Sequence, residues 1–394
     1  MSAKPKISYF LSHPIQYFSP LLAEMAKEFD LHVYYFSDAS IKGGMDKGFG
    51  REIKWDVPLL NGYNYTFLKN YSKSDSLSNK TFDAVNFGVI KKIVQDKSDV
   101  LIINGWSYFS NILVIITGRM LGKSVWLRSE NPLRSELKKS KKNLLLKKFF
   151  LKNIVFKLVS KFLYIGEESK DFFEYYGVPA KKLIYTPYAV NNSFFQTNYE
   201  AYKNKRESIL TELNLPVNHK VILYSAKYIP VKRPLDLIMA FEKLNIPDIS
   251  LVMVGEGELR NEMEYYIKNN NLKNVYLTGF VNQSLISKYY SIANVFVMCS
   301  EFEPWGLSIN EAINFNIPLV VSDIVGSVPN LVFNGQNGYV FEMGNIVDLS
   351  TCILKILNGS IESEKQTKLN SRILEIHDNK EIVKNLSLGI LKAK

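Results

Sequence analysis

Two glutamates with seven residues between them flank a glycine in the second half of the chain, at Glu303, Gly306 and Glu311. They follow an apolar run that predicts a strand ending at residue 298, and Gly306 opens an expected helix. The first N–H groups of a helix have no partner within it and carry partial positive charge, so they suit a phosphate. Gly306 also lets an anion approach the backbone closely. The pattern predicts an anion site with a carboxylate on each side.

The two carboxylates suit the two ends of a nucleotide-sugar. Glu311, about one and a half turns into the expected helix, could accept hydrogen bonds from two vicinal hydroxyls, as a ribose presents. Glu303, on the preceding loop, could reach a sugar ring on the other side of the phosphates. The alternative is a pair of solvated glutamates beside a helix start, and the spacing alone does not decide between the two.

Residues 225–234 form a second expected strand-to-helix loop, with Lys227 and Lys232 at its two ends. Two ammonium groups there could hold a diphosphate and neutralise charge on a leaving nucleotide without a metal ion. The alternative is two surface lysines on a loop. Gly255 and Gly257 follow a third expected strand, where they permit close backbone contact with a ligand, but two glycines in this spacing are a weak signal.

The elements that must position these residues alternate between short apolar runs and longer amphipathic stretches, which is typical of parallel sheets covered by helices. The expected strands are 7–11, 31–36, 100–103, 124–127 and 162–165, then 221–225, 250–254, 275–278, 295–298 and 319–322. A break rich in turn formers lies near residues 187–197. The chain is therefore expected to form two doubly wound, Rossmann-like α/β domains facing across a cleft, at 1–190 and 191–375. A helix at 376–394 is expected to pack back on one of them.

The positive charge is concentrated in the first half of the chain. Residues 1–196 have 29 Lys and Arg against 17 Asp and Glu, whereas the remainder has 20 against 21. Nine lysines and no acidic residue lie in residues 138–161, interleaved with Leu and Phe. This segment is interpreted as a moderately amphipathic helix, and it suggests peripheral attachment to an anionic membrane surface. The alternative is an ordinary helix with a solvated basic face. Nucleic acid is disfavoured because no recognition module accompanies the charge.

Composition excludes several other classes of protein. The two cysteines, Cys299 and Cys352, lie in apolar runs and are expected to be reduced core residues. No zinc-type ligand spacing is present, and no apolar stretch is long enough to span a membrane. The expectation is a cytoplasmic protein without a structural metal, located at most peripherally on the inner face of the plasma membrane.

Taken in order, these segments resemble the retaining family-4 glycosyltransferases of the GT-B fold, the glycosyl transferases group 1. Glu303 and Glu311 match the two glutamates of the family signature, and Gly306-Leu307-Ser308 match the helix that follows. The basic loop of the family pairs an arginine with a lysine five residues later, whereas this chain has Lys227 and Lys232, which loses the bidentate geometry of arginine. The similarity covers about residues 180–358.

The resemblance implies transfer of a sugar from a UDP-, GDP- or similar donor to a glycan or lipid-linked acceptor, with retention and without a metal or other cofactor. The resemblance also implies a role in the assembly of bacterial surface polysaccharides, in which members of this family commonly take part. The implied catalytic groups are Glu303, Lys227, Lys232 and Glu130. The implied donor-binding residues are Lys227, Lys232, Gly255, Val281, Glu303, Gly306, Leu307, Ser308 and Glu311.

The first half departs from the family pattern. Residues 12–17 replace a glycine-rich loop, and Glu130 stands near the place where many relatives have a histidine. We assign Glu130 to the cleft, and His13 and Gln16 to the acceptor side, although each could equally be a structural residue. Two rival hypotheses are a nucleotide-sugar epimerase of the same fold and a catalytically silent partner protein. A dehydrogenase is disfavoured because no glycine fingerprint follows the first strand.

Overall fold

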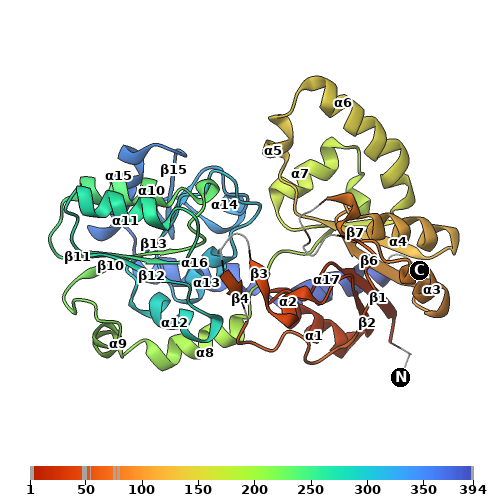
Figure 1. The fold of residues 1–394 in the computed structure, drawn as a ribbon, viewed down its shortest axis with the longest axis horizontal. Coiled ribbons are helices and arrows are strands. Elements are labelled where there is room, and N and C mark those ends of the chain that lie inside the picture. The colour runs from red at the N-terminus through yellow and green to blue at the C-terminus, as the bar shows by residue number, and fades with distance from the viewer. Residues whose placement is uncertain (1–3, 47–50, 54, 74–76, 78–79, 392–394) are drawn as a thin grey trace. The chain divides into compact units, whose positions relative to one another are not determined.

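The computed structural model describes residues 4–46, 51–53, 55–73, 77 and 80–391, and Figure 1 shows their fold. The chain divides into two compact units. Unit 1 contains residues 1–44, 58–188 and 379–394, and unit 2 contains residues 45–57 and 189–378. Each unit has its own parallel sheet and its own apolar core. Residues 45–57 therefore group with unit 2, although they lie within the first half of the sequence.

The sheet of unit 1 has seven strands in the order β5-β2-β1-β6-β7-β8-β9, and neighbouring strands are parallel. The strands are β1 (Lys6–Leu11), β2 (Asp30–Tyr35), β5 (Asn64–Phe67), β6 (Val100–Asn104), β7 (Ser124–Ser129), β8 (Lys161–Tyr164) and β9 (Leu183–Tyr185). A further pair, β3 (Gly44–Asp46) and β4 (Arg51–Ile53), stands apart from this sheet.

The α-helices of unit 1 are α1 (Phe18–Glu28), α2 (Ala39–Lys42), α3 (Gly88–Gln95), α4 (Phe109–Met120), α5 (Leu133–Leu137), α6 (Lys141–Phe150), α7 (Glu167–Tyr175) and α17 (Asn379–Leu391). Shorter turns are η1 (Thr81–Asp83), the π-helical η2 (Leu151–Val155), η3 (Phe156–Leu158) and η4 (Ala180–Lys182). α17 packs on α1 and β9, and a Cβ at Gly389 would lie 2.4 Å from Ile184. The expected helix at the end of the chain is therefore part of unit 1; residues 392–394 lie outside the described residues.

One expected helix differs from the observed structure, and α3 begins only at Gly88. The buried amide of Asn86 donates to the carbonyls of Phe36, Leu68 and Lys69 and holds the segment before α3 in a non-helical conformation. Residues 138–161 do not form one helix. α6 passes into the π-helical and 3-10 turns η2 and η3, and the segment ends in β8, since its second part is drawn into the core.

The sheet of unit 2 has six parallel strands in the order β12-β11-β10-β13-β14-β15. The strands are β10 (Lys220–Ser225), β11 (Ile249–Val254), β12 (Val275–Gly279), β13 (Val295–Met298), β14 (Leu319–Ser322) and β15 (Gly338–Phe341). β11, β13 and β14 are buried along their whole length, as expected for parallel strands covered on both faces. This explains why they were recognisable as continuous apolar runs.

The helices of unit 2 are α8 (Asn192–Tyr202), α9 (Arg206–Glu212), η5 (Pro230–Lys232), α10 (Pro234–Leu244), α11 (Arg260–Asn269), α12 (Gln283–Ile292), α13 (Leu307–Asn314), α14 (Val328–Leu331), α15 (Ile346–Leu357) and α16 (Ser363–Ile376). α10 and α15 pack together on the same core cluster as β10 and β11. α8 begins inside the stretch that the sequence predicted as a break between domains.

Candidate functional site

The chain order of both sheets reverses beside the first strand of each unit. In unit 2, β10 lies between β11 and β13, so the loops that follow β10 and β13 leave the same edge of the sheet on the two sides of a topological switch point. Ligands of open α/β sheets bind outside the carboxyl ends of the strands at such a point. Lys227 and Lys232 lie on the loop after β10, and Glu303 and Gly306 lie on the loop after β13. The sheet topology therefore brings these two predicted loops together.

The loop after β13 is fixed to its neighbour by backbone contacts. Gly326 donates its N–H to the carbonyl of Glu303 at 2.9 Å, and Glu303 forms an isolated parallel bridge with Val325. A Cβ at Gly326 would lie 2.1 Å from the carbonyl oxygen of Pro304, so only glycine permits this approach. Gly306 then takes a left-handed φ of 92° as the N-cap of α13. The loop is thus held rigidly up to the helix start.

Glu303 and Lys232 form an ion pair across the two loops. Both side chains are mostly buried, with exposed fractions of 17% and 19%. The pair lies at the switch point, one carboxylate and one ammonium side by side, next to the first turn of α13. Such an arrangement can present a cation to a phosphate and a hydrogen-bond acceptor to a hydroxyl at the same place.

Glu311 lies in the interior of unit 2. Its carboxylate is buried and accepts a hydrogen bond from the Tyr290 hydroxyl at 2.7 Å. Burial raises the pKa of Glu311 to about 7, against the lowering effect of hydrogen bonds from Tyr290 and Gln283. The sequence spacing correctly predicted that Glu311 lies on this helix. It gave no indication that the residue is buried, with 6% of it exposed.

The arginine next to Lys232 is already engaged. Arg233 adopts a left-handed φ of 48° before Pro234, and its guanidinium pairs with Asp236 at 2.6 Å and with Glu301 at 3.2 Å. Those carboxylates hold it at the start of α10. The half-buried Lys227 and Lys232 therefore stay the candidate cations of this loop.

The remaining predicted donor residues surround the same edge of the sheet. Gly255 follows β11, and a Cβ there would lie 2.0 Å from the carbonyl oxygen of Ala226, so the β11 and β10 loops are packed backbone to backbone. Leu307 and Ser308 form the first turn of α13, and both are half-buried. Val281 is half-buried between β12 and α12.

A segment from the first half of the sequence also reaches this edge of unit 2. The Asp56 carboxylate accepts from the backbone N–H of Ser284 at 3.2 Å, at the start of α12. The ring of Trp55 lies 6.0 Å from that of Phe280. Sequence reasoning missed these residues, because they lie more than two hundred positions from their partners and belong to no local motif.

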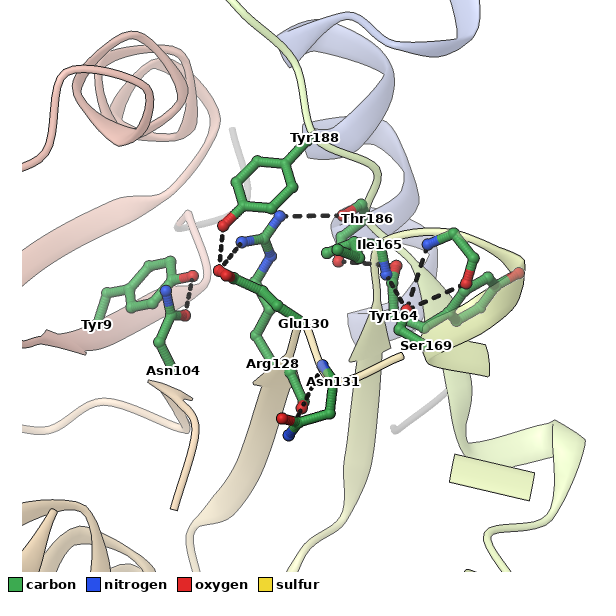
Figure 2. A network of polar contacts seen from close by, with 12 residues as sticks. Tyr9, Asn104, Arg128, Glu130, Asn131, Tyr164, Ile165, Ser169, Thr186 and Tyr188 are labelled. Carbon is green, nitrogen blue, oxygen red and sulfur yellow. Dashed lines mark hydrogen bonds and ion pairs between the residues drawn. The ribbon is translucent and has the colours of Figure 1, made fainter. Parts of the chain in front are cut away.

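Unit 1 has a polar cluster of its own at the carboxyl ends of its strands, drawn in Figure 2. Arg128, on β7, is 3% exposed, and its guanidinium stacks on the rings of Phe18 at 4.9 Å and Tyr188 at 4.4 Å. It donates to the carbonyl of Thr186 at 3.3 Å. Its Nε and Nη1 have no hydrogen-bond partner among the described residues.

Glu130 lies directly after β7 and is contacted by two members of that cluster, as Figure 2 shows. The Tyr188 hydroxyl donates to its carboxylate, and Arg128 Nη1 lies 3.8 Å from the same oxygen. The side chain of Glu130 remains 41% exposed. Burial raises the pKa of Tyr188 well above its ordinary value, so this phenol is a donor at neutral pH. Glu130 is therefore a solvent-accessible carboxylate whose position is fixed by Tyr188 and Arg128.

His13 and Gln16 lie on the loop after β1, beside the switch point of the unit 1 sheet between β1 and β6. His13 Nδ1 is 3.0 Å from Ser12 Oγ, and burial lowers the pKa of His13. The Gln16 Oε1 is buried without a hydrogen-bond partner in the part of the chain that the structure describes. Within the same residues, neither side chain is joined to Glu130 by a hydrogen bond or ion pair.

Among the residues described above, no three His, Cys, Asp or Glu side chains gather as a metal site would require. None of the described helices is long and apolar enough to cross a bilayer. Both cysteines are buried and unbridged.

Most of unit 2 is similar to a known protein family. Residues 205–373 match the family model of the glycosyl transferases group 1. That range contains both loops of the switch point and the whole of α13. The predicted donor residues therefore all lie inside the matched region.

Two curated relatives illustrate the range of similar proteins. One is the poly(ribitol-phosphate) alpha-N-acetylglucosaminyltransferase of Staphylococcus aureus (strain COL), 26% identical over 51% of this chain and 40% of its own length. Another is the UDP-Gal:alpha-D-GlcNAc-diphosphoundecaprenol alpha-1,3-galactosyltransferase of Escherichia coli, 32% identical over 38% of this chain and 39% of its own length. The chain spans 27% to 41% of the length of the first three curated relatives that it matches.

A solved structure covers the whole fold. Anabaena HepE in complex with UDP and glucose superposes with a TM-score of 0.72 over 98% of this chain and 100% of its own, at 16% identity. This likeness and the two parallel sheets show an α/β GT-B fold.

Proposed function

We propose that this protein is a glycosyltransferase that moves a sugar from a nucleotide-sugar to a glycan or lipid-linked acceptor, with retention at the anomeric carbon. The observation on which the proposal depends is the Lys232–Glu303 ion pair at the switch point of unit 2, beside the first turn of α13. It combines a cation for a diphosphate with a carboxylate for sugar hydroxyls, next to helix N–H groups that suit an anion.

The donor roles follow from this placement. Lys227 and Lys232 neutralise the charge that develops on the departing diphosphate, which is the largest electrostatic change in such a reaction. Glu303 positions the donor sugar together with the backbone of Gly306 and Leu307, and Ser308 lies in the same turn. Glu311 binds the ribose hydroxyls, whereas Gly255 and Val281 line the nucleoside side. We propose that the reaction needs no metal or other cofactor.

The acceptor roles belong to unit 1. Glu130 is the accessible carboxylate of its polar cluster and is proposed to accept a hydrogen bond from an acceptor hydroxyl. His13 and Gln16 lie on the loop at the switch point of that sheet and are assigned to the acceptor side. The two relatives described above are named for transfer to a poly(ribitol-phosphate) and to a diphosphoundecaprenol-linked sugar. By this similarity we propose a role in assembling a bacterial surface polysaccharide, with an anionic membrane surface as a further partner.

The proposal is tested in two steps. A panel of UDP- and GDP-sugars, with UDP and GDP alone, is first screened by thermal shift, and at least one is expected to raise Tm. Hydrolysis of that nucleotide-sugar, with water as the acceptor, is then measured for the wild type and two variants.

Glu303→Gln is expected to lower the rate about 100-fold or more, because it removes the charge of the pair and keeps the shape of the side chain. Glu301→Gln is the matched control on the same loop, since Glu301 pairs with Arg233 and not with Lys232. Its rate should stay within about threefold of wild type. No thermal shift with any nucleotide, or equal rates for the two variants, would refute the proposal.

A further inference from the structure

The two units differ in how much large apolar surface they expose. Among the described residues, seventeen exposed large apolar side chains belong to unit 1 and seven to unit 2, although the units have similar lengths. Exposed apolar residues that are scattered singly need no explanation, but a gathered set marks an interaction surface. Thirteen of the seventeen in unit 1 gather in two groups, on or beside neighbouring helices.

The first group is on α5, α6 and η2. Leu144 and Leu151 pack inward, while the opposite side of α6 presents apolar side chains to solvent. Leu145 is 69% exposed and Phe149 66% exposed. The exposed members of this group, which we term the α6 patch, are Leu137, Leu145, Leu146, Phe149, Phe150 and Ile154. Figure 1 shows α6 at the outer side of unit 1, away from strands β6 and β7.

The second group is on η1, α3 and α4 and was not predicted from the sequence. The rings of Phe82 and Phe87 lie 6.0 and 6.1 Å from that of Phe109, so an aromatic cluster joins η1, α3 and α4 at the surface. Phe82 is 69% exposed. The exposed members, which we term the α4 patch, are Tyr71, Phe82, Phe87, Ile90, Val94, Ile116 and Met120.

Both patches are on the helices that cover one face of the sheet. Inward residues of α3, α4, η2 and η3 belong to one core cluster, the one that also contains Phe162 of β8. α3 packs on α4, α4 contacts η3, and η3 continues from η2 and α6. α7 adds Phe172 and Phe173 to the same cluster, whereas α1 and α17 pack together and contribute nothing to it. The two patches therefore share one side of unit 1.

The charges around the patches have one dominant sign. Four lysines have no carboxylate partner among the described residues: Lys141, Lys142, Lys148 and Lys152. Lys141 and Lys148 lie along one edge of the apolar side of α6. Two acidic side chains that contact α5 or α6 are already paired: Glu136 with Lys139 and Lys147, and Glu168 with Arg134. Near the α4 patch, Lys69 lies over the ring of Tyr71.

We propose that the α6 and α4 patches together form the surface on which unit 1 docks to an anionic lipid bilayer. This inference rests on the membrane partner of the proposed function and does not depend on sugar transfer. Leu and Phe side chains enter the boundary between head groups and acyl chains, and the lysines beside them contact anionic head groups. A second copy of the chain fits this surface less well, because two such faces would bring lysines against lysines.

The test uses the full-length protein with vesicles of phosphatidylcholine alone or mixed with phosphatidylglycerol, separated by flotation at low and at high salt. The wild type is expected to float with the mixed vesicles at low salt and not with phosphatidylcholine alone. Leu145→Gln with Phe149→Gln tests the α6 patch, and Phe82→Gln with Met120→Gln tests the α4 patch. Each pair should lower the partition coefficient about tenfold, since it removes apolar groups and leaves the charge unchanged.

The matched control is Val347→Gln with Tyr265→Gln, two comparably exposed apolar side chains of unit 2. It should change the partition less than about twofold. Lys141→Gln with Lys148→Gln should weaken binding at low salt and reduce its dependence on salt.

Two outcomes would overturn the inference. One is a wild type that floats no better with phosphatidylglycerol than without it, or a patch variant that floats like the control. The other is an ultracentrifugation result in which the patch variants abolish a dimer yet still float, which would assign the surface to a second copy. A thermal shift with a nucleotide in every variant separates failure of this inference from failure of the proposed function.

Discussion

At the residue scale, Glu303 and Glu311 are stabilised in opposite ways. Glu303 is paired with an ammonium group, whereas Glu311 is buried beside a phenol and forms no ion pair with any described residue. The difference follows from their positions, one on a loop facing the β10 loop and one on the inward side of α13. Burial makes the Glu311 carboxylate costly to ionise in the free protein. Hydrogen bonds from the hydroxyl groups of a ligand would stabilise its ionised form.

Glu311 makes folding stability depend on pH. Its pKa of about 7 in the folded protein exceeds the ordinary value of 4.5, so the native state binds more protons than the unfolded state between these values. Stability should fall as pH rises through that window, by about 3 kcal/mol at most.

Glu311→Gln removes this cost and keeps an acceptor for Tyr290. We therefore expect a higher unfolding free energy than wild type at pH 8 and little difference at pH 4, measured by urea denaturation. The same variant should bind the nucleotide more weakly. A wild type whose stability does not change between pH 4 and pH 8 would show that the carboxylate is solvated.

Arg128 is expected to act through Glu130. Its guanidinium is buried between the rings of Phe18 and Tyr188, and its partner Glu130 stays in contact with water, so an apolar side chain of similar length leaves no buried carboxylate unpaired. We expect Arg128→Met to change the unfolding free energy by less than about 2 kcal/mol. Its transfer rate should nevertheless fall about tenfold or more, because Glu130 loses its support.

A double-mutant cycle checks this coupling. Glu130→Gln alone should give a similar loss of rate, and the double variant should be no slower than either single one, because both changes disrupt one unit. Additive losses would mean that Arg128 and Glu130 act independently.

At the element scale, close backbone contacts fix the position of the loop formed by residues 303–306. A side chain at Gly326 would meet the carbonyl of Pro304 at 2.1 Å, so Gly326→Ala must displace residues 303–306. We expect it to abolish the thermal shift caused by a nucleotide while the protein remains folded by circular dichroism. Gly335→Ala is the control, since Gly335 has a positive φ of 72° and a Cβ there would meet no atom within 4 Å. It should cost about 1 kcal/mol and leave nucleotide binding intact. Normal binding by Gly326→Ala would contradict the rigid loop.

At the scale of the whole molecule, the chain passes from unit 1 to unit 2 after Tyr188 and returns after Asp378. Asn192 ties the two passages together, because its amide donates to the His377 carbonyl at 2.9 Å and to Asp378 at 3.3 Å. It also accepts from Asn314, on the same helix as Glu311, at 3.1 Å. The buried amide thus connects both chain passages with α13.

Asn192→Ala leaves several of these buried groups without a partner and should lower the unfolding free energy by about 3 kcal/mol. Ser193→Ala, at an exposed neighbouring position, should lower it by less than about 0.5 kcal/mol. Urea denaturation should be followed by both tryptophan fluorescence and far-UV circular dichroism, because two units need not unfold together. Equal midpoints for the two variants would show that the amide contributes no net stability.

The fold class and the central strands could be predicted from the sequence alone. Buried parallel strands such as β11 and β13 are continuous apolar runs, and α13 starts where the glycine predicted it. The short strands β5, β9 and β15 were missed because they are only partly buried and lack a continuous apolar run, whereas the equally short β13 and β14 are fully buried.

The pairing of the polar side chains, and which of them are buried, could be learned only from the tertiary structure. It joined Lys232 to Glu303, engaged Arg233 elsewhere, buried Glu311 beside Tyr290 and placed Arg128 behind Glu130. It also showed exposed apolar side chains on α6 and, separately, on η1, α3 and α4. These outcomes depend on which strands are neighbours and on the direction of each side chain, and contacts between residues far apart in the chain leave no local pattern in the sequence.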